Sequence, residues 1–105
     1  MVVLHVLSND KKQVDEIAQL LVKEKLILSA VIQENLNSIQ RGKEGEIVNK
    51  NQILITGKTK ALLFNSIDKL LREKYPLTMP ELYSIPIVSM DWKQADQLIN
   101  ETAKV

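Results

Sequence analysis

The sequence has 105 residues, of which 45% are hydrophobic and 26% are charged, a balance typical of one globular domain over 1–105. Its 14 basic and 13 acidic side chains are interspersed and leave a net charge of +1, so no basic stripe is available to neutralise several phosphates, and we expect no nucleic-acid partner. The chain has no cysteine, which excludes disulfides, thiolate metal sites and cysteine nucleophiles.

The first segment, "VVLHVLS" at 2–8, is a run of apolar and β-branched residues that predicts a strand buried on both faces. It has no basic leader and is followed at once by polar residues, so we expect no membrane span and a cytoplasmic protein. Residues 10–25 then predict a surface helix, with Asp10 and Gln13 spaced as in a capping box. The apolar face of this helix is predicted to bury Val14, Ile17, Ala18 and Leu21.

Two extended segments at 26–40 and 47–58, joined by the glycine-containing turn "RGKEGE", predict a long antiparallel hairpin. Its base is apolar and its outer half is mostly polar. At about 3.3 Å per residue the first strand would span roughly 50 Å, whereas a sixteen-residue helix covers only about 24 Å. The hairpin is therefore expected to extend beyond its own domain.

A second helix is predicted at 59–75, with Thr59 as its N-cap and Pro76 ending it. Its buried stripe is predicted to be Leu63, Ile67, Leu70 and Leu71. The strand "ELYSIPIV" at 81–88 contains Pro86, which lacks a backbone donor and is tolerated only at a sheet edge. A last helix at 90–105 begins at the cap Asp91. The apolar face of this last helix is predicted to be Trp92, Ala95, Leu98 and Ile99.

This order of elements predicts an α+β, ferredoxin-like βαββαβ sandwich with an added C-terminal helix and sheet order 4-1-3-2. Right-handed crossovers place both crossover helices on one face of the sheet and leave the other face bare. An uncovered apolar sheet face and an overlong hairpin are most economically covered by copies of the same chain. We therefore predict a closed homo-oligomer.

Several segments, taken in order and spacing, resemble the CutA divalent-cation-tolerance family over nearly the whole chain. The most specific pieces are Lys58 with Thr59, Pro76 followed by "MPEL" around Glu81, and "IP" ending at Pro86. The resemblance implies a homotrimer with long intersubunit hairpins and sheets packed as a central barrel, related in shape to the P-II nitrogen-signalling proteins. It also implies tolerance of divalent cations, often copper, and no established enzymatic activity.

The sequence departs from the family at positions that bear on metal binding. The family usually has a cysteine in the segment matching "LSAVI", and a histidine and a tyrosine where this chain has Tyr75 and Leu77. The soft ligands expected to favour copper are therefore missing from those positions. No cofactor follows from the residues themselves, and a divalent cation, copper in particular, is implied only by the resemblance.

Four residues are candidates for a cleft between subunits: Lys58, Thr59, Tyr75 and Glu81. Glu81 would take an ion or an amine, or else pair with a lysine or cap a turn. Lys58 with Thr59 would hold an anion at a helix N-terminus, or Thr59 would only cap that helix. His5, the only histidine, is either a weak metal-ligand candidate or a hydrogen-bonded core or interface residue.

The leading hypothesis is a non-enzymatic, CutA-like homotrimer that binds or scaffolds, with a cation or small ligand held between subunits. The alternative is a P-II-like sensor that binds a nucleotide or metabolite at the same clefts, although the short turn "RGKEGE" disfavours a partner-reading loop. "GKT" is not a P-loop, because Gln52 stands where the spaced glycine is required. An enzyme is the weakest hypothesis, since one histidine and no cysteine leave little to build a nucleophile.

Overall fold

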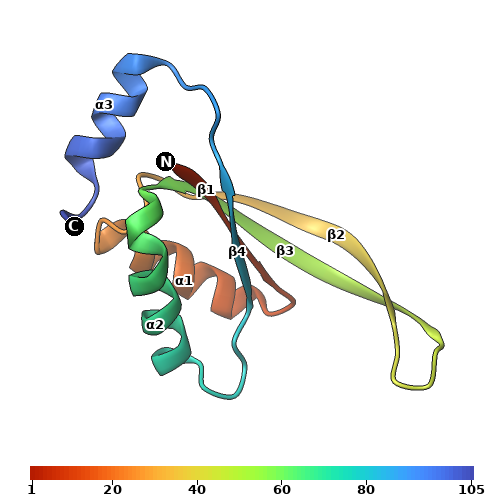
Figure 1. Ribbon diagram of the computed structural model, residues 1–105. Helices are drawn as coiled ribbons and strands as arrows, with labels where there is room; N and C mark the ends of the chain where they lie inside the picture. The colour runs from red at the N-terminus through yellow and green to blue at the C-terminus, as the bar shows by residue number, and fades with distance from the viewer.

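The computed structural model describes all residues, 1–105, and its order of elements is the one predicted (Figure 1). The elements are β1 (Val2–Ser8), α1 (Lys11–Lys23), β2 (Val31–Arg41), β3 (Ile47–Thr59), the short 3₁₀ turn η1 (Ala61–Leu63), α2 (Phe64–Lys74), β4 (Glu81–Pro86) and α3 (Trp92–Glu101). The sheet is antiparallel with order β2-β3-β1-β4, which is the predicted order counted from the other edge. Pro86 is the last residue of the edge strand β4, which was predicted to reach Val88. The amide of Ile87 still donates to the carbonyl of Met1 over 3.0 Å, so the missing donor of Pro86 is tolerated at this edge.

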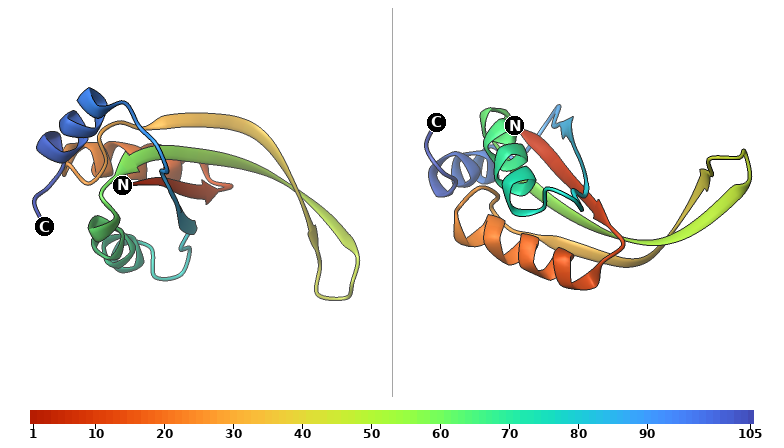
Figure 2. Two further views of the ribbon diagram at one scale, coloured as in Figure 1. Left: turned by 45° about the horizontal axis from the view of Figure 1, so that its top comes forward. Right: turned by 90° about the horizontal axis from the view of Figure 1, so that it is seen from below.

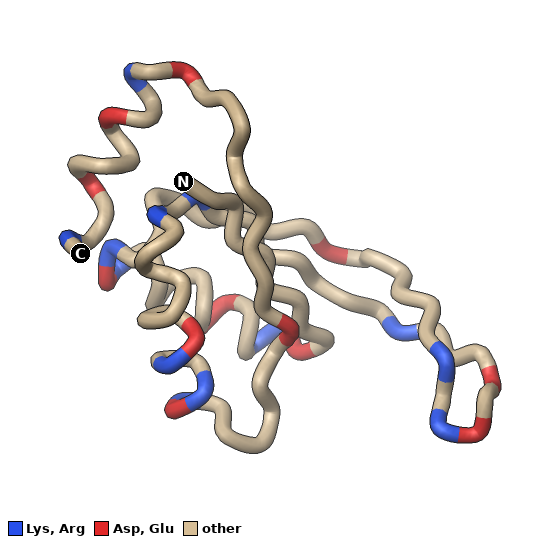
Figure 3. Tube along the Cα trace, viewed as in Figure 1, with Lys and Arg blue, Asp and Glu red and all other residues tan.

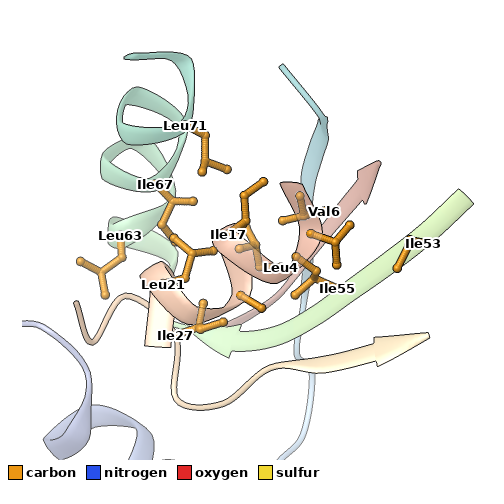
Figure 4. Packing of buried hydrophobic residues seen from close by; sticks show 12 residues of the cluster. Leu4, Val6, Ile17, Leu21, Ile27, Ile53, Ile55, Leu63, Ile67 and Leu71 are labelled. Carbon is orange, nitrogen blue, oxygen red and sulfur yellow. The ribbon is translucent and has the colours of Figure 1, made fainter. Parts of the chain in front are cut away.

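The core lies between one face of the sheet and the helices α1 and α2 (Figure 4). Alternate residues of β1 point to opposite faces, and Leu4 and Val6 point into this core. The predicted apolar face of α1 is fully confirmed, and α2 buries Ile67 and Leu71 as predicted. Leu70 is half-buried at the edge of the cluster.

The opposite face of the sheet has no cover within the chain, and we call it the bare face. On β1 it carries Val3, His5 and Leu7, which are half-exposed, so the prediction that this strand is buried on both faces is wrong for a single chain. Residues directly opposite one another in antiparallel strands share a face. The bare face therefore continues through Leu54, Thr56 and Lys58 of β3, Glu81, Tyr83 and Ile85 of β4, and Val31 and Gln33 of β2.

The hairpin of β2 and β3 extends beyond the helices, as predicted, and its outer part, residues 36–52, is called the arm here (Figure 2). The molecule is accordingly elongated, with extents of 48 × 29 × 20 Å. At the base of the arm β2 contains one extra residue, because Gln33 faces Leu54 but Leu36 faces Gln52. This β-bulge holds Asn35 in the left-handed region with φ of 61°.

The segment before β2 differs from the prediction. The strand begins at Val31, not at Leu26, and α1 ends at Lys23. Lys25 adopts a positive φ of 58° after the helix, and the amide of Leu26 donates to the carbonyl of Leu21 over 2.9 Å. This turn directs the buried side chain of Ile27 into the core.

The last helix, α3, covers little of the domain. Asp91 caps it as predicted, accepting from the amide of Gln94, and Leu98 is buried. Trp92, expected on the buried face, is 68% exposed, because the helix is attached only near its C-terminal end. There the amide of Ala103 donates to the carbonyl of Lys25 over 2.7 Å. None of the helices has the length and apolar character required to cross a membrane.

Candidate functional site

Lys58 and Glu81, two of the four predicted cleft residues, both lie on the bare face but at opposite ends of it. Lys58 is directly opposite Val3, and Glu81 is directly opposite Leu7. Four residues of a β-strand span about 13 Å. A single chain therefore does not bring these two charges together.

Glu81 lines a cleft of about 410 Å³ at the base of the arm. One wall is formed by the end of β1, the start of α1 and the segment before β4, and the other by three arm residues, Gln40, Lys50 and Gln52. The charged side chains of Lys50 and Glu81 have opposite signs, and neither forms an ion pair within the chain. The cleft therefore presents the ammonium group of Lys50 and two carboxylates, those of Glu81 and of the helix cap Asp10, among side-chain amides.

A buried polar pair supports one wall of this cleft. The hydroxyl of Ser8 donates to Oε1 of Gln13 over 2.5 Å, and Nε2 of Gln13 donates to the carbonyl of Thr78 over 2.7 Å. Gln13 is only 6% exposed, and these bonds fix the segment that leads to β4. The capping box is half confirmed, because Asp10 accepts from the amides of Lys12 and Gln13 while the Gln13 side chain points elsewhere.

Sequence reasoning did not assign Gln13 or Lys50 to a cleft. The signal for Gln13 was its spacing four residues before Ile17, which places it on the buried face of α1. No comparable signal marked Lys50, because its place in the cleft depends on how the arm curves.

Thr59 is the last residue of β3 and does not cap a helix, so the predicted capping role is wrong. Its side chain is 0% exposed, and its hydroxyl donates to the carbonyl of Leu26 over 2.6 Å. The following turn begins at Ala61, and Lys60 before it makes no side-chain cap. Neighbouring strand residues point to opposite faces, so Thr59 lies on the core side and Lys58 on the bare face. The two residues do not form one anion site.

Tyr75 connects the two crossover helices and is not among the residues that line the cleft. It follows α2, and its hydroxyl donates to Oε1 of Glu16 on α1 over 2.9 Å. Partial burial and this bond to a carboxylate raise the pKa of Tyr75 to about 12. The phenol therefore stays protonated at neutral pH and serves as a structural donor.

His5 lies at the middle of the bare face, and its Nδ1 is 3.2 Å from the hydroxyl oxygen of Tyr83. The two ring centroids are 5.2 Å apart at an interplanar angle of 64°, an edge-to-face arrangement.

Charged residues of both signs are scattered over the helices and the arm (Figure 3). No three His, Asp or Glu side chains come together to hold a metal ion, so the residues of one chain do not fit the copper that the resemblance implies.

Comparisons with known proteins agree with the fold described above. The family model described as CutA1 divalent ion tolerance protein matches residues 2–98. A divalent-cation tolerance protein CutA from Thermus thermophilus is 31% identical over 86 residues, 82% of each chain. The solved structure of a divalent cation tolerance protein (Cut A1) from the same organism superposes with a TM-score of 0.86 at 28% identity, covering 98% of this chain and 100% of that one. For CutA1 from Oryza sativa the TM-score is 0.87 at 22% identity, covering 99% and 94%.

Proposed function

This chain belongs to the CutA1 divalent ion tolerance family, and from that premise we propose that it acts as a non-enzymatic homotrimer. Its role would be to bind or to scaffold, with an ion or small ligand held in the clefts between subunits. The trimer is the assembly that the family resemblance implies.

The arm is the observation that carries this proposal. An isolated two-stranded ribbon is marginally stable in water, yet this arm extends past its own domain with Ile39 and Ile47 exposed at 65% and 69%. No other part of the same chain covers these two side chains. In a closed ring of identical subunits each arm would lie against a neighbour, and the three bare faces would be buried together.

The charges on the bare face support a copy of the same chain as the partner. Lys58 and Glu81 lie at opposite ends of the face, and a head-to-tail ring would place the Lys58 end of one subunit beside the Glu81 end of the next. The net charge of +1 adds almost no repulsion between copies. The predicted cleft would then be completed between subunits.

The ligand that this cleft favours is polar. Glu81, Lys50 and the amides of Gln40 and Gln52 present oxygen and nitrogen groups, and the lining has no thiolate or imidazole, its one sulfur being the thioether of Met79. Such groups suit a hydrated hard cation or a small charged molecule better than copper.

Sedimentation equilibrium tests the assembly. We expect a mass three times the 11.9 kDa of one chain at micromolar concentration. Ile47→Glu should weaken the trimer, whereas the matched control Leu77→Glu, at a loop residue that is 95% exposed, should not. A stable, folded monomer for the unchanged chain would overturn the proposal.

Native mass spectrometry with magnesium, copper, zinc and ATP tests the ligand. Retention of a hard cation by the trimer and not by Glu81→Gln would support the cleft. A nucleotide bound at one per cleft would instead favour the P-II-like sensor. The arm turn argues against that sensor because it is short and closed, with the amide of Gly42 donating to the carbonyl of Glu46 over 2.8 Å.

A further inference from the structure

The single histidine of the chain occupies the centre of the bare face. His5 is the middle residue of the three that β1 presents there, with Val3 and Leu7 on either side along the strand. Thr56 of β3 and Tyr83 of β4 lie directly opposite it on the two neighbouring strands. In a trimer formed through the bare faces, this position would be enclosed between subunits.

The surroundings of His5 contain few charges. The diagonal neighbours on the bare face are Leu54 and Lys58 on β3, and Glu81 and Ile85 on β4. Tyr83 is the one titratable group in contact with the ring. Along β1 the next charge is the amino group of Met1, four residues away. Lys58 and Glu81 have opposite signs, and neither is directly opposite His5 on a neighbouring strand.

We propose that His5 makes assembly through the bare face dependent on pH, with the trimer formed while the imidazole is neutral and weakened when it is protonated. This inference rests on the proposed trimer and adds its regulation. A neutral ring can accept a hydrogen bond from the Tyr83 hydroxyl through Nδ1, which is 3.2 Å away. A protonated ring can only donate, and an imidazolium enclosed between subunits would have no opposite charge in contact with it, since the ring contacts only Tyr83 among titratable groups.

The physical basis is the cost of removing a charge from water. An ionised group without a partner is strongly disfavoured in apolar surroundings and loses its proton instead. The reference pKa of an imidazole is about 6.5, and one pH unit below its pKa a basic group gains about tenfold from protonation. If the trimer excludes the proton at all three sites, its dissociation constant rises by about a thousandfold between pH 8 and pH 5.5. Most carboxylates stay ionised over this interval.

Sedimentation of the fluorescently labelled chain over a dilution series, at pH 8 and pH 5.5, measures this change. We expect the unchanged chain to lose affinity at pH 5.5 by about a thousandfold. His5→Leu and His5→Gln should both abolish the dependence, and two variants are used in case one does not fold. The Met1 amino group is present in every variant, so any pH dependence of assembly that comes from groups other than the imidazole remains in both variants.

Because His5 is the only histidine, the proton on its Cε1 gives one resonance of its kind that can be followed by NMR in the assembled protein. We expect this resonance to keep its neutral position until the trimer dissociates. Three results overturn the inference: an affinity that does not change with pH, a dependence that survives in both variants, or an imidazole that titrates freely within an intact trimer. A chain that is monomeric at both pH values is a different result, since it overturns the proposed trimer itself.

Discussion

The hydroxyl of Thr59 is predicted to stabilise the fold at the end of β3, in place of the cap or anion contact that its sequence context suggests. It donates to the carbonyl of Leu26 over 2.6 Å. Leu26 lies outside the helices and strands, and no backbone amide donates to its carbonyl. The bond attaches the end of β3 to the turn after α1. Thr59→Val removes it while keeping the shape of the side chain, and Thr59→Ser keeps it while removing one methyl group.

The expected magnitudes follow from the complete burial of the side chain. Loss of the bond leaves the carbonyl of half-buried Leu26 without this donor, and we expect Thr59→Val to cost about 1–2 kcal/mol. Loss of one buried methyl group costs about 1 kcal/mol, which is our expectation for Thr59→Ser. A helix cap would give a different pattern, because serine caps at least as well as threonine and Thr59→Ser would then cost nothing.

Urea unfolding at one fixed subunit concentration measures these differences, since stability of an assembling protein depends on concentration. The same curves are recorded with inorganic phosphate added. The interpretation is refuted if Thr59→Val is as stable as the unchanged chain. It is also refuted if phosphate stabilises the unchanged chain but not the valine variant, because that result would restore an anion site at Thr59.

Three further predictions concern the bulge, a close approach of the backbone and a tyrosine. Asn35 has a φ of 61°, so Asn35→Val should lower the free energy of unfolding by about 1–2 kcal/mol, while Asn35→Gly should leave it unchanged or raise it, both by urea unfolding. A Cβ at Gly57 would lie 2.9 Å from Cδ1 of buried Ile27, so Gly57→Ala should cost about 1–3 kcal/mol in the same assay, and a neutral result would contradict the packing. The pKa of Tyr75 is raised to about 12, so the stability that its protonated form contributes is complete below pH 10 and lost as the pH rises through 12. Ultraviolet titration should show a step near pH 12 that Tyr75→Phe removes, and a step near pH 10 for this tyrosine would contradict its bond to Glu16.

The order of elements and the core were predictable because they depend on periodicity. The stripe of Val14, Ile17 and Leu21 on α1 fixes which face is buried, whatever the partner. The excess length of the hairpin was also predictable, because strand length is proportional to residue number. The order of elements, the core and the length of the hairpin can therefore be predicted from local residue patterns and residue numbers alone.

The start of β2 was not predictable in the same way. Residues 26–28 are apolar and resemble a strand, but Lys25 takes a left-handed conformation that glycine or asparagine usually marks. Because lysine is not typical of this conformation, the sequence does not indicate the turn. Thr59 was misassigned for the opposite reason, since threonine before a helix is a common cap and only the tertiary contact with Leu26 overrides that preference.

Of the four residues predicted for a cleft, only Glu81 lines the cleft of the single chain, so the sequence predicted one member of the site and not its arrangement. Glu81 was expected in a cleft with the hairpin, and it lines one with Gln40 and Lys50. Lys58 was expected in the same intersubunit cleft, and within one chain the antiparallel register places it opposite Val3, at the other end of β1. Register sets distances between residues that are far apart in sequence, and composition and spacing do not determine it.

The bulge at the base of the arm decides which side chains continue the bare face. Side chains of a strand alternate with a period of two, so one extra residue in β2 moves its later residues to the other face. Without the bulge Asn37 and Ile39 would follow Val31 and Gln33 on the bare face, whereas the observed register places Leu36 there, opposite Gln52.

With the bulge in place, both faces of the arm carry apolar side chains. Leu36 and Val48 continue the bare face and are half-buried, while Ile39 and Ile47 lie on the other face and are exposed. A partner that covered only one face of the arm would leave one of these pairs in water. The arm is therefore expected to be enclosed from both sides in the assembly, and Leu36→Asp and Ile39→Asp should each weaken it although their side chains point in opposite directions.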